Sequence, residues 1–471
     1  MARLFLINPL TDEPIRSPLL AFLYLAASLR RAGHEVELFD GSASNAPAGT
    51  PQLVERIRAF GPDVVGIHCK TLYALESYGL ARELRELGVT APFVCGGPHP
   101  TVVPLEPLAH GFEFSVRGEG EETLVELCDA LDGKRQMSTV RSLVFRDTTG
   151  AIQLNEPRGF LLELDQLAKP ADALDLFDPA WYGKSEPVPP AGLLSSRGCP
   201  AACTFCSNNV TGRRFRYRSP ELIKEEIEHF ARIAGLRAFA FFDDSFAVGR
   251  RRVEELCAVL KAMPEKPMWT CTAHPAHLHR DVMLMMKQAG CGGVDIGMES
   301  GDAEMLLRIG KGVTKDRVLE VLCSAKQIGL HAMLNLMFGW PGETDAELRA
   351  TLDFMEAAAP FATAFNARGV LVPYPGTEIY DLHHRTYGFT DWWLKKPVRY
   401  QPFPMTWARG EVERAYAEDA ALEHNFFRLP QSSLDLIKEG LAAKARHTFA
   451  RVSAAYGNPK KLPAIPAAGA R

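Results

Sequence analysis

The first 130 residues alternate between short apolar runs and longer amphipathic stretches. Short apolar runs are typical of buried strands, and they cover residues 4–7, 35–39, 63–68, 92–95 and 114–117. The stretches between them carry apolar residues at helical spacing, at 19–32, 51–60, 75–87 and 121–132. Strands that alternate with helices in this way predict a doubly wound parallel sheet, in which ligands bind beyond the carboxyl ends of the strands.

The same alternation restarts near residue 192. It predicts strands at 193–195, 238–242, 268–272, 293–298, 331–338 and 364–372. It predicts helices at 220–234, 252–263, 281–289, 315–328 and 345–358. This number of β/α units predicts a partial parallel barrel, (β/α)6, whose chemistry lies at the carboxyl ends of its strands.

These patterns predict an α/β protein in four parts. Residues 1–150 form the first α/β domain and 191–390 the barrel, and a segment rich in Pro, Asp and Leu, 151–190, links them. After Pro375 the periodicity weakens, so we expect a small helical region over 391–471. Its predicted helices cover 411–427 and 432–455, and its tail from residue 459 is expected to be disordered.

Composition narrows the possible partners. Lys and Arg number 53 against 57 Asp and Glu, a net charge of −4, so no polyphosphate-binding surface is indicated and we expect no nucleic-acid partner. The uncharged stretch 327–342 is interrupted by glycines and a proline, so no membrane span is expected. Too few apolar residues precede Asn8 for a secretion signal, and we expect a cytoplasmic protein.

Three of the ten cysteines lie together on the loop after the first predicted barrel strand, as Cys199, Cys203 and Cys206. Thiolates in the spacing CxxxCxxC can each bind one iron of a cubane and leave the fourth iron open to a chelating ligand. Structural zinc is the alternative, but it usually has four protein ligands, and no fourth Cys or His lies within twenty residues of Cys206. The triplet therefore predicts a 4Fe–4S cluster.

Polar and glycine-rich loops follow three strands of the first domain. They read Cys69-Lys70-Thr71-Leu72, Gly96-Gly97-Pro98-His99-Pro100-Thr101 and Gly118-Glu119-Gly120. Glycines at strand ends allow a flat, bulky ligand to approach the backbone, although taken alone they are equally typical of ordinary turns. No GxGxxG follows the first strand, which removes the main support for a dinucleotide site.

The cysteine triplet, with Phe205 before its third cysteine, resembles the signature of radical S-adenosylmethionine (SAM) enzymes. Further segments resemble, in order, the strand-end motifs of the cobalamin-binding branch of that superfamily, and they lie at 243–246, 297–301, 338–344 and 373–377. The glycine-rich loops resemble those of its cobalamin domain. Over residues 1–380 the chain is identified as similar to cobalamin-dependent radical SAM enzymes, most of all to their methyltransferase branch.

The resemblance implies three cofactors: a 4Fe–4S cluster, SAM and cobalamin. It implies that Cys199, Cys203 and Cys206 hold the cluster and are the catalytic residues. It implies that the other cofactor-binding residues are Phe205, Asp243, Glu299, Ser300, Lys70, Thr71, Leu72, Gly96, Gly97, His99, Gly118 and Glu119. Lys70 stands where a serine is usual, and the motif DxHxxG is absent, so we expect no protein histidine on cobalt.

The implied activity is C-methylation of an unactivated carbon in a small-molecule or natural-product substrate. It would proceed through methylcobalamin and a 5′-deoxyadenosyl radical, with electrons from an external flavodoxin- or ferredoxin-type donor. The alternative keeps the same cofactors for oxidative cyclisation or ring contraction, and the sequence does not separate the two. A methylthiotransferase would need a second cysteine triad, and a cobalamin sensor would have no use for the first.

Overall fold

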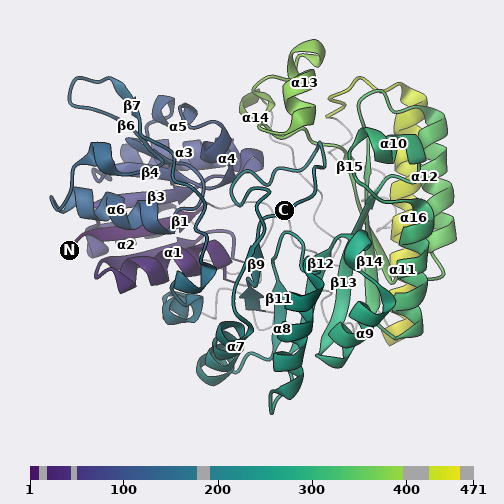
Figure 1. Cartoon of the computed structure of the whole chain (residues 1–471). Coiled ribbons are helices and arrows are strands. Elements are labelled where there is room, and N and C mark those ends of the chain that lie inside the picture. Colours follow the sequence, from purple (N-terminus) through teal and green to yellow (C-terminus); the bar gives the residue numbers. More distant parts are fainter. Residues whose placement is uncertain (10–17, 44–49, 178–190, 396–423, 457–471) are drawn as a thin grey trace. The chain divides into compact units, whose positions relative to one another are not determined.

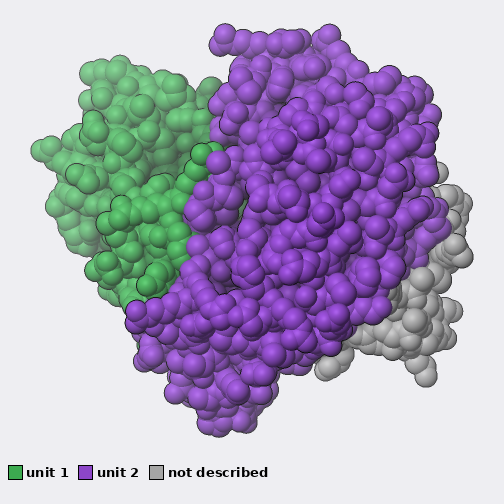
Figure 2. All heavy atoms as spheres, turned by 45° about the vertical axis from the view of Figure 1, so that its right-hand side comes forward, with its two compact units in different colours: residues 1–184, 207–218, 391–397 green, residues 185–206, 219–390, 398–471 purple. Residues whose placement is uncertain are grey.

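The computed structural model describes residues 1–9, 18–43, 50–177, 191–395 and 424–456. The chain forms two compact units (Figure 2). Unit 1 comprises residues 1–184, 207–218 and 391–397, and unit 2 comprises 185–206, 219–390 and 398–471. Two short segments from outside the N-terminal part of the chain, 207–218 and 391–397, therefore group with the N-terminal residues. The division into four domains with a linker at 151–190 stays a prediction.

Unit 1 is built on a seven-stranded sheet in the order β2-β1-β3-β4-β5-β6-β7 (Figure 1). Its strands are β1 (Arg3–Asn8), β2 (Glu35–Asp40), β3 (Val64–His68), β4 (Phe93–Gly96), β5 (Phe114–Val116), β6 (Leu143–Arg146) and β7 (Ile152–Leu154). Its helices include α1 (Leu20–Arg31), α2 (Thr50–Phe60), α3 (Ala74–Glu86), α4 (Pro98–Val102), α5 (Glu106–Ala109) and α6 (Glu121–Leu131). The predicted parallel sheet is confirmed for β1 to β5.

The antiparallel edge formed by β6 and β7 was not predicted. All three residues of β7 are exposed, so the strand lacks the apolar alternation by which a half-buried strand is recognised. It lies inside the segment predicted to be a linker. The short helices α4 and α5 were also missed, because a helix of four or five residues spans too few turns to show a period.

Unit 2 contains a six-stranded sheet in the order β15-β14-β13-β12-β11-β8, and every neighbouring pair is parallel. The strands are β8 (Ala191–Leu193), β11 (Ala238–Phe241), β12 (Met268–Ala273), β13 (Cys291–Glu299), β14 (His331–Phe338) and β15 (Ala364–Val370). The helices between them are α7 (Pro220–Ala234), α8 (Arg250–Ala262), α9 (Arg280–Gln288), α10 (Ala303–Arg308), α11 (Lys315–Gln327) and α12 (Asp345–Ala358). The predicted order of β/α units is confirmed.

Three helices follow the last strand in the described residues: α13 (Glu378–Tyr387), α14 (Trp392–Lys395) and α16 (Gln431–Tyr456). The helix predicted at 432–455 is confirmed by α16, whereas α13 and α14 were not predicted. Helix α16 packs along β15 and α12 at the edge of the sheet (Figure 1). Most of the helix predicted at 411–427, and the tail from 459, lie outside the described residues. No helix within the described ranges is long and apolar enough to cross a membrane.

Candidate functional site

Two aspartates after β11 hold the entrance to the cysteine loop in unit 2. Asp243 is fully buried, and its carboxylate accepts hydrogen bonds from the Ser195 amide at 2.7 Å and the Ser196 hydroxyl at 2.6 Å. Asp244 Oδ2 accepts from the amide of Gly198, which directly precedes Cys199, at 2.8 Å. Asp243, predicted to bind a cofactor, thus uses its oxygens to fix the chain that leads into the triplet.

The loop that carries the triplet rests on the turn after α10. The Thr204 amide donates to the Ile309 carbonyl at 3.0 Å. Gly310 has a φ of +65°, and a Cβ there would lie 2.9 Å from the Ala202 carbonyl oxygen, so only glycine lets the turn approach this closely. Cys199 and Cys203 are half-buried, whereas Cys206 is exposed. The thiols therefore lie on a braced loop and remain partly open to a ligand.

No three His, Cys, Asp or Glu side chains converge on a single metal ion in the part of the chain that the structure describes. Thiolates that hold a cubane bind different irons, so the three cysteines need not meet at one point. The surroundings of the triplet fit a cluster that thiolates would hold, because a buried cation lies close enough to offset negative charge there. That cation is Lys311, whose ammonium interacts electrostatically with Cys203 and Cys206.

Lys311 forms a buried ion pair with Glu299 beside the triplet. Its Nζ lies 2.9 Å from Glu299 Oε1, and the two side chains are 8% and 9% exposed. Burial pushes the pKa of Lys311 down, but the Glu299 carboxylate together with Cys203 and Cys206 outweighs burial, and the pKa lies above its ordinary value. Burial raises the pKa of the Cys203 thiol, and Lys311 opposes that rise. A Cβ at Gly297 would overlap this pair, so the glycine leaves the space that the pair fills.

The remaining predicted residues of unit 2 divide into two groups. The Phe205 ring packs edge-on against Trp340 at 5.2 Å and lies 6.0 Å from Lys311 Nζ, so it shares the site with Glu299. Ser300, in contrast, is fully buried, and its hydroxyl lies 3.3 Å from Thr351 Oγ1 of α12. The structure therefore brings Phe205 and Glu299 to the triplet, and it turns Ser300 toward a helix.

A buried carboxyl lies in the loop after β14. Glu343 Oε2 accepts from the amides of Gly339 and Trp340 at 2.7 and 3.1 Å, and burial raises the pKa of Glu343 to about 8. Its other oxygen has no hydrogen-bond partner among the described residues. A carboxyl in this state carries its proton at neutral pH and adds no negative charge to the site.

In unit 1 the three predicted loops lie at neighbouring strand ends. Register pairs His68 of β3 with Gly96 of β4. Gly97 has a φ of +120°, and a Cβ there would lie 2.7 Å from His68 Cδ2 and 2.8 Å from the Cys69 carbonyl. A Cβ at Gly96 or at Gly118 would meet nothing within 4 Å. The backbone is therefore tightly packed at Gly97, and there is open space at Gly96 and at Gly118. A cradle for a bulky ligand requires such open space next to the backbone.

Hydrogen bonds tie these loops together. His99 Nδ1 lies 3.1 Å from Thr71 Oγ1, and the His99 amide donates to the Cys69 carbonyl. Thr101 Oγ1 donates to the Gly97 carbonyl at 2.8 Å and accepts from the Gly118 amide at 3.0 Å. Lys70 and Leu72 are half-buried in the same loop. Every predicted residue of unit 1 except Glu119 belongs to this connected set.

Glu119 is used elsewhere within unit 1. Its two carboxylate oxygens lie 2.8 and 3.0 Å from Arg216 Nη1, and the side chains of this pair are 8% and 2% exposed. Arg216 also donates to the Leu161 carbonyl and lies over the Phe160 ring. The pair anchors residues 207–218, the segment that follows Cys206. Nothing near Glu119 in the sequence points to a partner 97 positions away.

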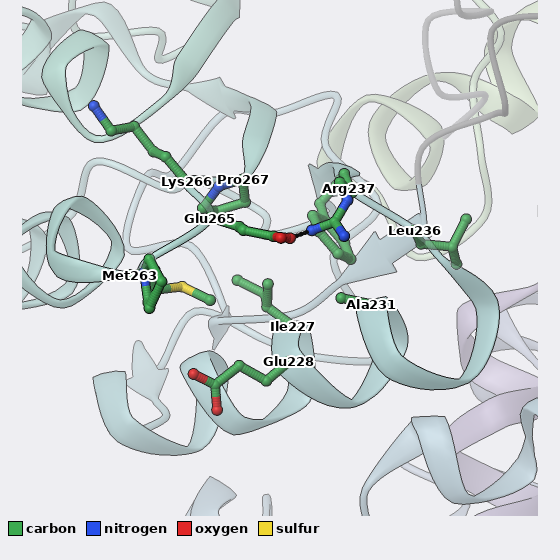
Figure 3. Close-up of a pocket in the computed structure, with 11 residues that line it drawn as sticks. Ile227, Glu228, Ala231, Leu236, Arg237, Met263, Glu265, Lys266 and Pro267 are labelled. Atoms are coloured by element: carbon green, nitrogen blue, oxygen red, sulfur yellow. Dashed lines mark ion pairs between the residues drawn. The ribbon is translucent and has the colours of Figure 1, made fainter.

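One hollow on unit 2 lies apart from these residues (Figure 3). It measures about 200 Å³ and is bounded by the segments that enter β11 and β12, where Arg237 pairs with Glu265. This is the amino-terminal side of the sheet, which in parallel barrels serves stability and not chemistry. None of the predicted site residues lines it.

Comparison with known families identifies the class of each unit. Residues 193–355 match the radical SAM superfamily, and residues 17–128 match the B12 binding domain. Two solved structures share the fold. The radical SAM methyltransferase TsrM from Kitasatospora setae is 22% identical, with a TM-score of 0.69 over 82% of this chain and 77% of TsrM. The cobalamin-dependent SAM radical enzyme OxsB is 19% identical, with a TM-score of 0.67 over 83% of this chain and 56% of OxsB.

Relatives of similar sequence identify the family. An uncharacterized methyltransferase, PH0819, from Pyrococcus horikoshii is 30% identical over 80% of this chain and 82% of that protein. The bacteriochlorophyllide d C-8(2)-methyltransferase of Chlorobaculum tepidum is 25% identical over 96% and 97%. The chain belongs to the cobalamin-dependent radical SAM methyltransferase family, whose cofactors are a 4Fe–4S cluster, SAM and cobalamin. The predicted family, enzyme class and cofactors are confirmed.

Proposed function

We propose that the chain is a C-methyltransferase that acts on an unactivated carbon of a small-molecule or natural-product substrate. The observation that carries this proposal is the Glu299–Lys311 ion pair, which lies buried beside the three-cysteine loop. This pair places a carboxylate and an ammonium group side by side. The amino group of SAM would be attracted by the first and its carboxylate by the second. When bound, the cluster and SAM supply hydrogen abstraction, and cobalamin supplies methyl carriage.

The residues of unit 2 would bind and orient these groups. Cys199, Cys203 and Cys206 hold the cluster, and the positive charge of Lys311 offsets part of the negative charge that thiolates bring into a partly buried site. Glu299 would accept hydrogen bonds from the ammonium or ribose hydroxyls of SAM. Phe205, packed on Trp340, would hold an apolar wall beside them and exclude water.

The residues of unit 1 would hold the corrinoid. Gly96 and Gly118 leave open space next to the backbone, and Gly97 lets the two loops meet. Burial, together with the nearby Lys70 ammonium, lowers the pKa of His68 to about 3, so this ring stays neutral. Thr71, Leu72 and His99 complete the same set of loops. For Glu119 we retain a supporting role next to the site through its pairing with Arg216.

Non-methylating radical chemistry is the second candidate function. It is favoured by a relative from Synechocystis, an anaerobic magnesium-protoporphyrin IX monomethyl ester cyclase, which is 28% identical over 72% of this chain and 67% of that protein. Such chemistry would use the same three cofactors. Under either function we expect an external flavodoxin- or ferredoxin-type electron donor and a cytoplasmic location.

The test is cofactor loading followed by labelled SAM. The full chain is reconstituted anaerobically with iron, sulfide and hydroxocobalamin, desalted, and assayed for metals, and about four irons and one cobalt per chain are expected. The loaded protein is then reduced and incubated with SAM that carries a deuterated methyl group. S-adenosylhomocysteine should form only in samples that contain cobalamin, and the label should appear on the extracted corrinoid.

Two results would overturn methyl transfer. If the reconstituted chain contains iron but no cobalt, unit 1 does not bind cobalamin. The chain would then be a simpler radical SAM enzyme. Formation of 5′-deoxyadenosine with no S-adenosylhomocysteine would favour the cyclase-like alternative. A parallel sample reconstituted without cobalamin provides the background for both products.

A further inference from the structure

A buried carboxylate in unit 1 gathers donors from distant parts of the chain. Glu106 Oε1, at the start of α5, accepts from the Tyr78 hydroxyl at 2.9 Å, from His99 Nε2 at 2.9 Å and from the Trp393 indole at 3.0 Å. Its side chain is 12% exposed. Burial alone would raise the pKa of Glu106, but the hydrogen bonds from these three donors lower it, so the carboxylate stays ionised. We call these four side chains the Glu106 hub.

The hub reaches the candidate cobalamin loops through His99. Because a carboxylate only accepts, His99 Nε2 must donate to Glu106, which fixes the ring and leaves Nδ1 facing Thr71 Oγ1 at 3.1 Å. The His99 amide also donates to the Cys69 carbonyl. Two of the three loops that form the proposed corrinoid cradle therefore take their positions from one fixed imidazole.

Trp393 is the member of the hub that sequence proximity cannot explain. It lies 287 positions after Glu106, and the residues before it, 219–390, belong to unit 2. Its indole nitrogen is 3.0 and 3.1 Å from the two Glu106 oxygens, and its ring meets His99 edge-on at 5.4 Å. Its helix, α14, has four residues, which is too short to be stable without such contacts.

We propose that Trp393 is a positioning residue for cobalamin, which it supports by closing the Glu106 hub and thereby fixing His99 and Thr71. This inference rests on the proposed function, because it assumes that the loops of unit 1 bind the corrinoid. It adds a contribution from the C-terminal segment to a site that the family match places within residues 17–128. Cobalamin affinity in the full chain should therefore depend on a side chain near residue 393.

The experiment compares hydroxocobalamin binding by the full wild-type chain with that of W393F, E106Q and E106L. Phenylalanine keeps an aromatic ring but removes the indole donor, and we expect W393F to bind about tenfold more weakly, the cost of one buried hydrogen bond. E106Q keeps the Oε1 acceptor and should retain more affinity than E106L. W392F is the matched control, because Trp392 is buried beside Trp393 and is not one of the four side chains of the Glu106 hub.

A double-mutant cycle separates positioning from general stability. If Trp393 acts through His99 on Thr71, the variant T71V/W393F should bind cobalamin about as well as T71V alone. Additive losses, or wild-type affinity in W393F, would overturn the proposal. Should W393F fail to fold, the ranking of E106Q above E106L decides the matter. If the wild-type chain itself binds no cobalamin while it retains iron, the proposed function fails instead, so the two failures are distinguishable.

Discussion

Glu299 of unit 2 and Glu106 of unit 1 both lie beside candidate cofactor loops, and their carboxylates are stabilised differently. In unit 2, Glu299 is paired with the cation Lys311 at 2.9 Å. In unit 1, Glu106 is surrounded by Tyr78, His99 and Trp393, which share the carboxylate among several donors. Removal of one partner should therefore leave Glu299 as an isolated buried charge, whereas Glu106 would keep most of its hydrogen bonds. The stability of the Glu299 carboxylate therefore depends on one residue, whereas that of the Glu106 carboxylate depends on several.

The largest predicted effect separates the two units completely. Cys203→Ala should abolish the 4Fe–4S cluster and SAM cleavage, because one iron of the cubane loses its protein ligand. Cobalamin should remain bound, since its candidate loops belong to unit 1. Iron and cobalt analysis after anaerobic reconstitution measures both outcomes in one sample.

Cys323→Ala is the matched control for that variant. Cys323 lies on α11, is half-buried, and belongs to no predicted site, so the substitution should leave both metals in place. Retention of SAM cleavage by Cys203→Ala would refute the assignment of the triplet. Loss of cobalt together with iron would show that the two units do not load independently.

The next prediction concerns the ion pair. Lys311→Met removes the cation that pairs with Glu299, and leaving a buried carboxylate unpaired costs about 3 kcal/mol of unfolding free energy. Denaturant unfolding of the protein without its cofactors measures this cost. Lys311→Arg keeps the charge and should lose much less stability.

The double variant Glu299→Gln/Lys311→Met tests the cause. It removes both charges, so it should recover much of the stability lost in Lys311→Met. No recovery would mean that the lysine acts through packing and not through its charge.

By the same comparison, loss of a single donor to Glu106 should cost about 1 kcal/mol, because other donors still satisfy the carboxylate.

The sequence predicted what is local in both units. The parallel strands β1 to β5 of unit 1 and the six strands of the partial barrel were predicted from apolar runs, and the cysteines and loop glycines follow those strands closely in the sequence. It did not predict the pairing of Lys311 with Glu299, nor the pairings of Arg216 and Trp393 with carboxylates 97 and 287 positions away, because such partners are recognised only in the folded chain. A lone charged residue in a loop is usually solvated, and only the folded structure shows that Lys311 is buried against Glu299.

The predicted roles of several residues also depended on where side chains point. Asp243, Ser300 and Glu119 follow strands, as ligand-binding residues do, yet each makes hydrogen bonds to its own unit. Strand position places a residue at the right edge of a sheet, but it does not determine whether the side chain faces the ligand or the neighbouring backbone. Phe205 and Glu299 lie at the same edge and do face the triplet.

A third prediction uses pH to identify a buried acid that has no cationic partner at hydrogen-bond distance among the described residues. The ordinary pKa of Glu343 is 4.5, and burial raises it to about 8. Between these values the folded state holds a proton that the unfolded state has lost, so stability falls by about 1.4 kcal/mol for each unit of rising pH. Glu343→Gln carries no such proton, and its stability relative to the wild type should rise with pH over this window and level off above it.

Denaturant unfolding of both proteins across that window measures the difference, and the slope is the informative quantity. Gln keeps the acceptor oxygen for the Gly339 and Trp340 amides, so any part of the stability difference that does not change with pH reflects packing alone. If the difference does not change with pH at all, Glu343 is ionised in the folded protein. In that case the carboxyl would resemble Glu299 and not a neutral group.

The last prediction compares two adjacent glycines in unit 1, of which Gly96 should have the smallest effect on stability, and it separates folding from ligand binding. Gly97→Ala places a Cβ against His68 and the Cys69 carbonyl at a φ of +120°, so it should lower stability by about 1–3 kcal/mol. Gly96→Ala adds a methyl group to open space and should leave stability nearly unchanged. If the corrinoid fills that space, Gly96→Ala should nevertheless weaken cobalamin binding.

Thermal unfolding of the cobalamin-free variants and cobalamin titration of each distinguish these effects. The combination that supports the cradle is a stable Gly96→Ala protein with reduced cobalamin affinity, because only a ligand can then be in contact with the new methyl group. Full affinity in Gly96→Ala would place the corrinoid elsewhere on unit 1. In that case the requirement for glycine at position 97 would be purely structural. It would follow from the close approach of the two loops that the His68–Gly96 register brings together.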